Sequence, residues 1–362
     1  MTISQRRDRL RQRLADADLD GMLVSDLVNV RYLSGFTGSN AALLVRPDSE
    51  MPVLATDGRY RTQAAQQSPD AEVVIERACG PHLAGRAAED GVRRLGFESH
   101  VVTVDGFAAL RKAAGDSTEP VRAAGTIEAL REVKDAGEIA LLRLACEAAD
   151  AALADLVERG GLRAGRTEKE VARELESLML DHGADGVSFE TIVAAGANSA
   201  IPHHRPTDAV LAEGDFVKID FGALVCGYHS DMTRTFVLAQ PAQWQLDIYE
   251  LVAAAQQAGR DALAPGMTLK DVDAASRQVI ANAGYADNFS HGLGHGVGLQ
   301  IHEAPGISAS AAGTLLSGSA VTVEPGVYLP DHGGVRIEDT LVVCDRAPDL
   351  LTRFPKELVV IN

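Results

Sequence analysis

The chain has 362 residues, of which 46% are hydrophobic, and it carries a formal net charge of −17 at pH 7. This length predicts two domains, each large enough for a substantial core. The acidic balance argues against a nucleic-acid partner, because phosphate binding needs a basic surface, and no apolar run of about 18 residues is present that would span a membrane.

The N-terminal segment alternates amphipathic helices with short apolar strands, which is typical of an α/β layer. We predict this α/β domain over residues 1–125 and a second domain over residues 126–362. The predicted strands of the first domain are Gly21–Ser25, Ala41–Val45, Pro52–Thr56, Glu72–Ile75 and Arg94–Glu98.

A long helix that starts near Asp135 opens the second domain. Asp135 and Glu138 can cap this helix, and its apolar residues recur at helical spacing, which predicts a buried stripe. Further helices are expected from Thr167 to about Gly183, over Gln243–Leu263, and from Thr268 to about Gly284.

An internal repeat divides the second domain. The segment Leu162–Val171 resembles Leu263–Val272, which begins 101 residues further along the chain. In each copy a threonine can cap the helix that it opens, and an acid three residues later can complete a capping box. The repeat therefore predicts two similar α+β halves.

Four acidic residues occupy corresponding positions in these halves. Asp220 and Glu324 each close an apolar strand, whereas Asp231 and Glu338 each begin a return strand. An acid at the end of an apolar strand must be paired, hydrogen-bonded or metal-bound, because burying it alone is costly. Taken singly, each acid is best interpreted as a salt-bridge partner or a turn residue. Together with His295, which lies in a glycine-rich segment, the four acids form the ligand set expected of two divalent metals, and this indicates a hydrolase.

Seven short motifs in the second domain resemble those of the pita-bread metallopeptidases, and specifically the creatinase/prolidase/aminopeptidase P branch. The segments Asn29–Gly38 and Thr56–Tyr60 resemble the leading domain of the same family, so the resemblance covers essentially the full chain. The seven motifs are Asn198–His203, Ile219–Gly222, Ser230–Thr235, His291–Leu299, Ile301–Pro305, Val323–Gly326 and Val335–Asp339.

The resemblance implies an α+β fold in which two pseudo-symmetric halves surround a curved antiparallel sheet, preceded by a creatinase-like α/β domain. It also implies that Asp220 holds one metal ion, that His295 and Glu324 hold a second, and that Asp231 and Glu338 bridge the two. Predominantly oxygen ligands favour manganese, with cobalt or zinc as alternatives. The ions would lower the pKa of the attacking water, and Glu324 would carry a proton to the leaving nitrogen.

The resemblance further implies that His203, His291 and His302 surround the substrate and donate to its carbonyl group, to the developing oxyanion or to the leaving amine. For each of them, a hydrogen-bonded structural histidine is the alternative. The neighbouring His204 competes with His203 for this role, and the Pro-His register of the motif favours His203.

Two further residues are candidates for support of the site. Arg336 could pair with a bridging acid and hold its geometry, and this interpretation is favoured over an exposed sheet arginine because Ile337 and Glu338 follow it directly. Tyr228 precedes the candidate ligand Asp231 in a predicted hairpin, where plain packing explains it equally well.

The implied activity is hydrolysis of the Xaa-Pro bond at the N-terminus of dipeptides or short peptides. In the dipeptidase branch an arginine commonly follows the His-Glu-x-Pro stretch and grips the substrate carboxylate, but here that place holds Gly306. Loss of this cation makes cleavage of longer peptides at least as strong an expectation. The alternatives are a metal-independent C–N hydrolase and a non-catalytic binding protein on the same fold, although either would be expected to discard metal ligands.

The sequence also supports expectations about the cellular compartment and the oligomeric state of the protein. The first ten residues mix charges and lack the apolar core of a secretory signal. The four cysteines are widely spaced and form no Cys-x-x-Cys pair, so they are interpreted as reduced thiols, although spacing alone leaves disulfides open. We expect a cytoplasmic enzyme, and the resemblance implies a homodimer.

Overall fold

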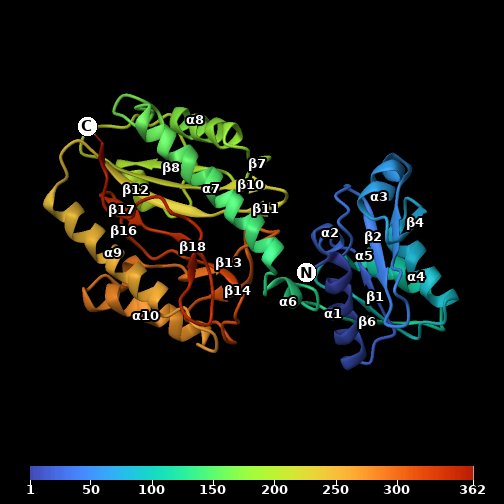
Figure 1. Ribbon diagram of the computed structural model, residues 1–362. Helices are drawn as coiled ribbons and strands as arrows, with labels where there is room; N and C mark the ends of the chain where they lie inside the picture. Colours follow the sequence, from blue (N-terminus) through green and yellow to red (C-terminus); the bar gives the residue numbers. More distant parts are fainter. Residues whose placement is uncertain (362) are drawn as a thin grey trace. The chain divides into compact units, whose positions relative to one another are not determined.

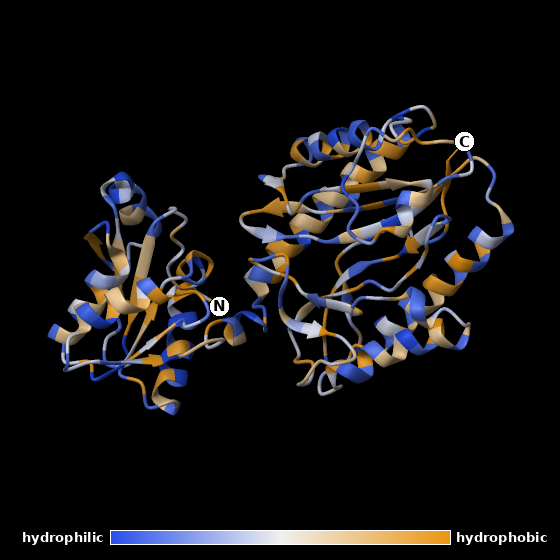
Figure 2. Ribbon diagram, turned by 180° about the vertical axis from the view of Figure 1, so that it is seen from behind, coloured by the Kyte–Doolittle hydropathy of each residue, from blue (hydrophilic) through white to orange (hydrophobic). Residues whose placement is uncertain are grey.

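The computed structural model describes residues 1–361 and divides into two compact units, Met1–Arg131 and Glu132–Asn362 (Figure 1). Helices in both units carry hydrophilic as well as hydrophobic residues, as the hydropathy colouring shows (Figure 2), and this is the pattern of helices with one buried and one exposed face. Among residues 1–361, no helix combines the length and the apolar character needed to cross a lipid bilayer.

A six-stranded mixed sheet forms the first unit, in the order β4-β3-β2-β1-β5-β6. Strand β1 is antiparallel to β2 and parallel to β5. Leu23 of β1 packs with α4 and α5 in one hydrophobic cluster, whereas its neighbours Met22 and Val24 face the other side, because side chains alternate along a strand. The alternation of strands and helices that the sequence predicts is therefore present.

The elements of the first unit are β1 (Gly21–Val24), β2 (Ala41–Val45), β3 (Val53–Thr56), β4 (Glu72–Ile75), β5 (Arg94–Phe97), β6 (Glu119–Arg122), α1 (Ile3–Asp16), α2 (Leu27–Ser34), η1 (Gly58–Tyr60), α3 (Arg61–Gln67), α4 (Cys79–Glu89), α5 (Val104–Ala114) and α6 (Glu128–Arg131).

Two similar halves make up the second unit, and each half combines a pair of packed helices with a sheet. Helix α7 packs against α8 in the first half, and α9 packs against α10 in the second. The first half contains the sheet β20-β12-β9-β8, and the second contains the sheet β14-β13-β15-β18-β19; the small sheets β11-β10-β7 and β16-β17 complete the unit. The repeat found in the sequence thus corresponds to a repeat of architecture.

The helices of the second unit are α7 (Ala136–Glu158), α8 (Glu168–Asp181), η2 (Gly196–Ala200), α9 (Gln243–Asp261), α10 (Leu269–Asn282) and η3 (Ala286–Asn288). Its strands are β7 (Gly186–Val187), β8 (Ile192–Ala195), β9 (Phe216–Phe221), β10 (Ala223–Val225), β11 (Tyr228–His229), β12 (Met232–Leu238), β13 (Gly294–Gly296), β14 (Glu303–Ile307), β15 (Ala320–Val323), β16 (Gly326–Leu329), β17 (Gly333–Arg336), β18 (Asp339–Val342), β19 (Asp349–Leu350) and β20 (Val360–Ile361).

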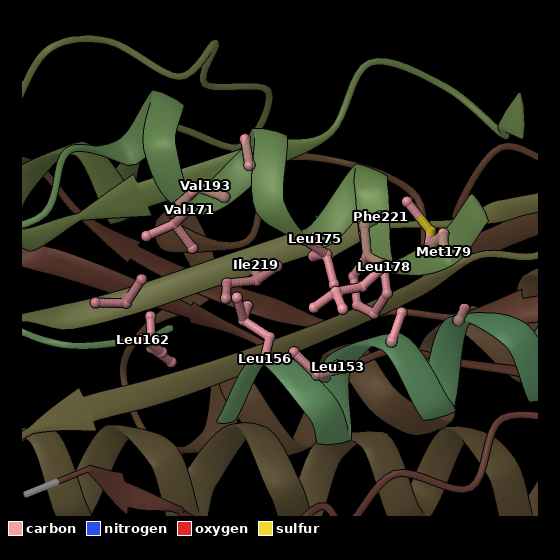
Figure 3. Close-up of a cluster of buried hydrophobic side chains, with 14 of the residues drawn as sticks. Leu153, Leu156, Leu162, Val171, Leu175, Leu178, Met179, Val193, Ile219 and Phe221 are labelled. Atoms are coloured by element: carbon pink, nitrogen blue, oxygen red, sulfur yellow. The ribbon is translucent and has the colours of Figure 1, made fainter. Parts of the chain in front are cut away.

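The core of the first half lies between its helix pair and its sheet. Leu156 of α7 and Leu175 of α8 pack in one cluster with Ile219 and Phe221 of β9 (Figure 3). All four side chains are buried, and burying a large aliphatic or aromatic side chain contributes about 1.5–3 kcal/mol each. A separate cluster lies between α9, α10 and the sheet of the second half.

The two copies of the repeat begin their helices in related but unequal ways. Thr167 and Glu170 form the expected capping box at the start of α8. Thr268 also caps its helix by accepting from the N–H of Asp271, but the Asp271 carboxylate bonds to the Thr268 hydroxyl. Aspartate is one methylene shorter than glutamate, which explains why the full box forms only in the first copy.

Antiparallel pairing then brings the four acids to corresponding positions. Strand β9 pairs with β12 so that Asp220 lies opposite Thr233, and Asp231 directly precedes β12. In the second half Glu324 directly follows β15, and Glu338 directly precedes its partner β18. Because the end of one strand meets the beginning of its antiparallel partner, each half presents two carboxylates at one end of its sheet.

Candidate metal centre

A cavity of about 270 Å³ lies between the two halves of the second unit, and all five predicted metal ligands line it. Two of them come from the first half and three from the second. The lining residues are Phe189, Glu190, Ile192, His203, His204, Arg205, Asp220, Asp231, His295, Ile301, His302, Glu324 and Glu338.

Donor atoms of Asp231, His295 and Glu338 all lie within 4.8 Å of one another. The Nε2 atom of His295 is 3.4 Å from a carboxylate oxygen of Asp231 and 3.4 Å from one of Glu324. The other ring nitrogen, Nδ1, is 3.0 Å from the carbonyl oxygen of Gly296. Donation from Nδ1 to that carbonyl leaves the Nε2 lone pair directed at the acids, which is the tautomer of a metal ligand.

Asp220 contributes an oxygen that has no hydrogen-bond partner within residues 1–361. Its Oδ2 atom accepts a hydrogen bond from Arg336, but its Oδ1 atom is buried and forms no hydrogen bond among the described residues. A buried carboxylate oxygen without a partner is costly, and a bound cation would satisfy it. Asp220 therefore fits the role of a metal ligand.

The acids of the cavity destabilise one another. Burial, followed by the charges of Glu338 and Asp220, raises the pKa of Asp231 well above its ordinary value. Burial and the charge of Glu324 do the same for the pKa of Glu338, and burial raises the pKa of Glu324 to about 7. Bound divalent cations would attract these carboxylates and offset the repulsion between them. The donor set, rich in oxygen and completed by one imidazole, fits such ions.

Arg336 lies behind the acids, but it pairs with Asp220 and not with Asp231 or Glu338, the acids expected to bridge the ions. It is 2% exposed, and it donates to Asp220, to the hydroxyl groups of Thr233 and Tyr328, and to the carbonyl oxygen of Pro202. Thr233 in turn donates to Glu338 at 2.6 Å. Arg336 thus connects a candidate ligand from each half with the segment that carries His203.

The predicted histidines occupy two kinds of position. His203 and His302 line the cavity, and the ring of His302 lies edge-on to that of His295 with 4.3 Å between the ring centroids. His291 is absent from the cavity wall. Its Nε2 atom is 2.8 Å from the hydroxyl of Tyr328, and burial lowers the pKa of His291 to about 4, which keeps its ring neutral.

Glu168 holds the segment that carries His203. It is fully buried and accepts hydrogen bonds from the N–H of Ala195, the side chain of Asn198, and both the N–H and the hydroxyl of Thr207. His204, the alternative to His203, has its Nε2 atom 2.8 Å from Glu168. The side chain of His204 therefore has a structural partner, although it also borders the cavity.

Lys218 of β9 supports the same segment. Its ammonium group is fully buried and donates to the carbonyl oxygens of Ile201 and Pro202. The two residues before His203 are therefore held by a lysine and, through Pro202, also by Arg336.

Sequence reasoning missed several residues of this arrangement, namely Glu168, Lys218, Thr233 and Tyr328. A lysine in the middle of the apolar strand Phe216–Phe221 was the clearest available signal, because a buried charge needs partners. Tyr228, which the sequence did single out, donates from its hydroxyl to Glu138 at 2.9 Å and does not border the cavity.

Comparison with known proteins agrees with these observations. Residues 140–345 match the model of metallopeptidase family M24, and residues 6–133 match the creatinase/prolidase N-terminal domain. The chain is 35% identical to the Xaa-Pro dipeptidase of Pyrococcus furiosus over 99% of its own length and 100% of that protein.

Two solved structures are similar over nearly the full chain. The Xaa-Pro dipeptidase from Bacillus anthracis superposes with a TM-score of 0.94 at 38% identity, covering 99% of this chain and 100% of that chain. The X-Pro aminopeptidase from Thermotoga maritima superposes with a TM-score of 0.90 at 34% identity, covering 98% of this chain and 99% of that chain. The expected pita-bread fold with a creatinase-like N-terminal domain is confirmed.

Proposed function

The chain belongs to metallopeptidase family M24 and is a hydrolase, and we propose that it is a dinuclear-metal exopeptidase that cleaves the Xaa-Pro bond at the N-terminus of dipeptides or short peptides. The observation that carries this proposal is the cavity in which four carboxylates and His295 face one another from both halves of the fold. A non-catalytic binding protein would have no need to keep such a repulsive cluster.

Two divalent ions, preferably manganese with cobalt or zinc as alternatives, would occupy this cluster. Asp220 would hold one ion, His295 and Glu324 would hold the other, and Asp231 and Glu338 would bridge them. When bound, the ions supply Lewis-acid polarisation of the peptide carbonyl and lower the pKa of the attacking water.

The side chains of the protein bind and orient the peptide. His203 and His302, which border the same cavity, donate hydrogen bonds to the carbonyl oxygen of the scissile bond as negative charge develops there. Glu324 accepts a proton from the attacking water and transfers it to the proline nitrogen as the C–N bond breaks. The acids attract the free N-terminal ammonium group of the peptide, and this restricts cleavage to the first bond.

His291 supports this arrangement from outside the cavity. Its neutral ring accepts from the hydroxyl of Tyr328, which in turn accepts from Arg336. We infer that His291 fixes the orientation of Arg336, and thereby of Asp220, rather than touching the substrate.

The open space beside Gly306 determines the length of the peptides that the site accepts. Gly306 pairs with His295 in the sheet, and a Cβ atom added at Gly306 would meet nothing within 4 Å. Without a cation at this position, the protein accepts short peptides as well as dipeptides. Similarity to both a dipeptidase and an aminopeptidase supports this breadth.

The test is hydrolysis of Xaa-Pro dipeptides and Xaa-Pro-Yaa tripeptides by the metal-stripped enzyme, with and without added Mn²⁺ or Co²⁺. Matched Xaa-Ala peptides serve as the control for proline specificity. We expect metal-dependent release of the first residue from the proline peptides. The proposal would be contradicted if the enzyme cleaved neither the Xaa-Pro dipeptides nor the Xaa-Pro-Yaa tripeptides with any of the metals.

A further inference from the structure

The wall of the metal cavity carries a single arginine. Among the residues that line it, Arg205 is the only lysine or arginine, whereas five of them are acidic. Arg336 is also close, but it is buried and occupied by Asp220 and by its other acceptors. A substrate group with a negative charge therefore meets one available guanidinium group in this cavity.

The backbone of Arg205 is held in place on both sides. His204, the residue before it, and Thr207, two residues after it, both bond to the buried carboxylate of Glu168. Pro206 fixes its own φ angle and restricts Arg205 to extended conformations. The backbone from which the side chain of Arg205 extends is therefore rigid.

The side chain of Arg205, by contrast, is free to exchange its partner. Its Nε atom is 3.0 Å from a carboxylate oxygen of Glu190, and the two side chains are 83% and 61% exposed. Exposed ion pairs of this kind contribute little, about 0–1 kcal/mol. A carboxylate from a bound molecule can therefore replace Glu190 at small cost.

We propose that Arg205 binds the C-terminal carboxylate of an Xaa-Pro dipeptide and that Glu190 competes with this carboxylate for the guanidinium group. The inference rests on the proposed function and names the group that determines substrate length at the same site. Arginine suits the role because its planar fork can bind a carboxylate through two parallel hydrogen bonds. Gly306 offers no such group.

The competition has a consequence for substrate preference. A dipeptide must displace Glu190 to reach Arg205, and the negative charge of Glu190 also repels the incoming carboxylate. In a longer peptide the carboxylate lies at least one residue further from the metals, so its binding does not depend on this exchange. Competition from Glu190 thus reduces the preference for dipeptides over longer peptides that Arg205 alone would produce.

The experiment compares an Xaa-Pro dipeptide with its C-terminal amide, which lacks only the negative charge. Arg205→Met should raise KM for the dipeptide about tenfold, the loss expected on removing a charge-assisted hydrogen bond, and should leave kcat and the KM for the amide unchanged. Arg205→Lys should restore part of the dipeptide affinity. Glu190→Gln should lower KM for the dipeptide by up to about fivefold, because an exposed competing ion pair is removed.

Arg159→Met is the matched control. Arg159 also forms an exposed ion pair, with Asp155 on α7, and it lies outside the cavity wall, so neither substrate should be affected. Equal effects of Arg205→Met on the dipeptide and the amide, or no effect on either, would overturn the assignment. If the wild-type enzyme cleaves neither compound, the assignment fails; if it also cleaves no Xaa-Pro-Yaa tripeptide, the proposed function fails as well.

Discussion

Replacement of Glu168 by alanine tests how the protein positions its catalytic segment. Glu168 is fully buried and accepts five hydrogen bonds, from Ala195, Asn198, His204 and both donors of Thr207. Loss of one partner of a buried charged network costs about 3–5 kcal/mol. For a unit of this size we expect the melting temperature to fall by about 6–20 °C, at roughly 2–4 °C per kcal/mol.

The same substitution should reduce catalysis without removing the metals. The five donors span the segment that carries His203, and none of them belongs to a predicted metal ligand. We expect kcat/KM for Xaa-Pro substrates to fall about 10–100-fold, as it does when groups that orient active residues are lost, while metal content measured by mass spectrometry stays unchanged. Glu170→Gln is the control, because Glu170 lies on the same helix turn and glutamine also completes a capping box.

The pH dependence of stability provides a second readout for Glu168. Burial alone would raise the pKa of Glu168, but the hydrogen bonds from Ala195, Asn198, His204 and Thr207 outweigh it and lower the pKa below its ordinary value. A lowered folded-state pKa stabilises the protein above the unfolded value of about 4.3, and this contribution disappears as the pH falls through the folded-state pKa. The stability difference between the wild type and Glu168→Gln should therefore be constant above about pH 5 and shrink in more acidic solution. For the alanine variant, the positioning role of Glu168 would be refuted if Glu168→Ala kept the kcat/KM and the melting temperature of the wild type.

Three further predictions concern the cavity itself. Asp231→Ala and Glu338→Ala should each abolish peptide hydrolysis and lower metal content together, because both acids are assigned to both ions; activity retained by either variant would exclude the bridging assignment. Gly306→Arg should lower KM for dipeptides relative to tripeptides by about tenfold, since the space beyond Gly306 is open, and an unchanged ratio of the two KM values would contradict the interpretation of this position. His302→Ala should reduce kcat about 10²-fold, as loss of a donor to the developing oxyanion does, with metal content unchanged; loss of metal instead would assign His302 to the ligand set.

The sequence predicted the ends of the strands that carry the acids. Asp220 and Glu324 follow mostly apolar runs, and such runs mark buried strands whose final acid needs a partner. The repeat predicted that each half would contribute a pair of carboxylates, and Asp231 and Glu338 each directly precede the return strand of their half. Local patterns were sufficient here because each acid belongs to the hairpin that positions it.

The supporting network could not be predicted in the same way. Glu168 reaches partners between 27 and 39 residues away, and in the sequence it is simply an acid in the first turn of a helix. Tyr328 connects His291 with Arg336, three residues that share no local motif. Contacts of this kind depend on how helices, loops and strands pack within each half, which neither periodicity nor spacing reports.

The central claim is that the four acids and His295 hold two catalytic metal ions. Its most direct test is a titration of metal-stripped protein with Mn²⁺, in which bound metal and the rate of Xaa-Pro hydrolysis are measured on the same samples. We expect activity to rise with bound metal and to saturate at two ions per chain. Full activity in the metal-free protein, or saturation at a single ion, would contradict the account.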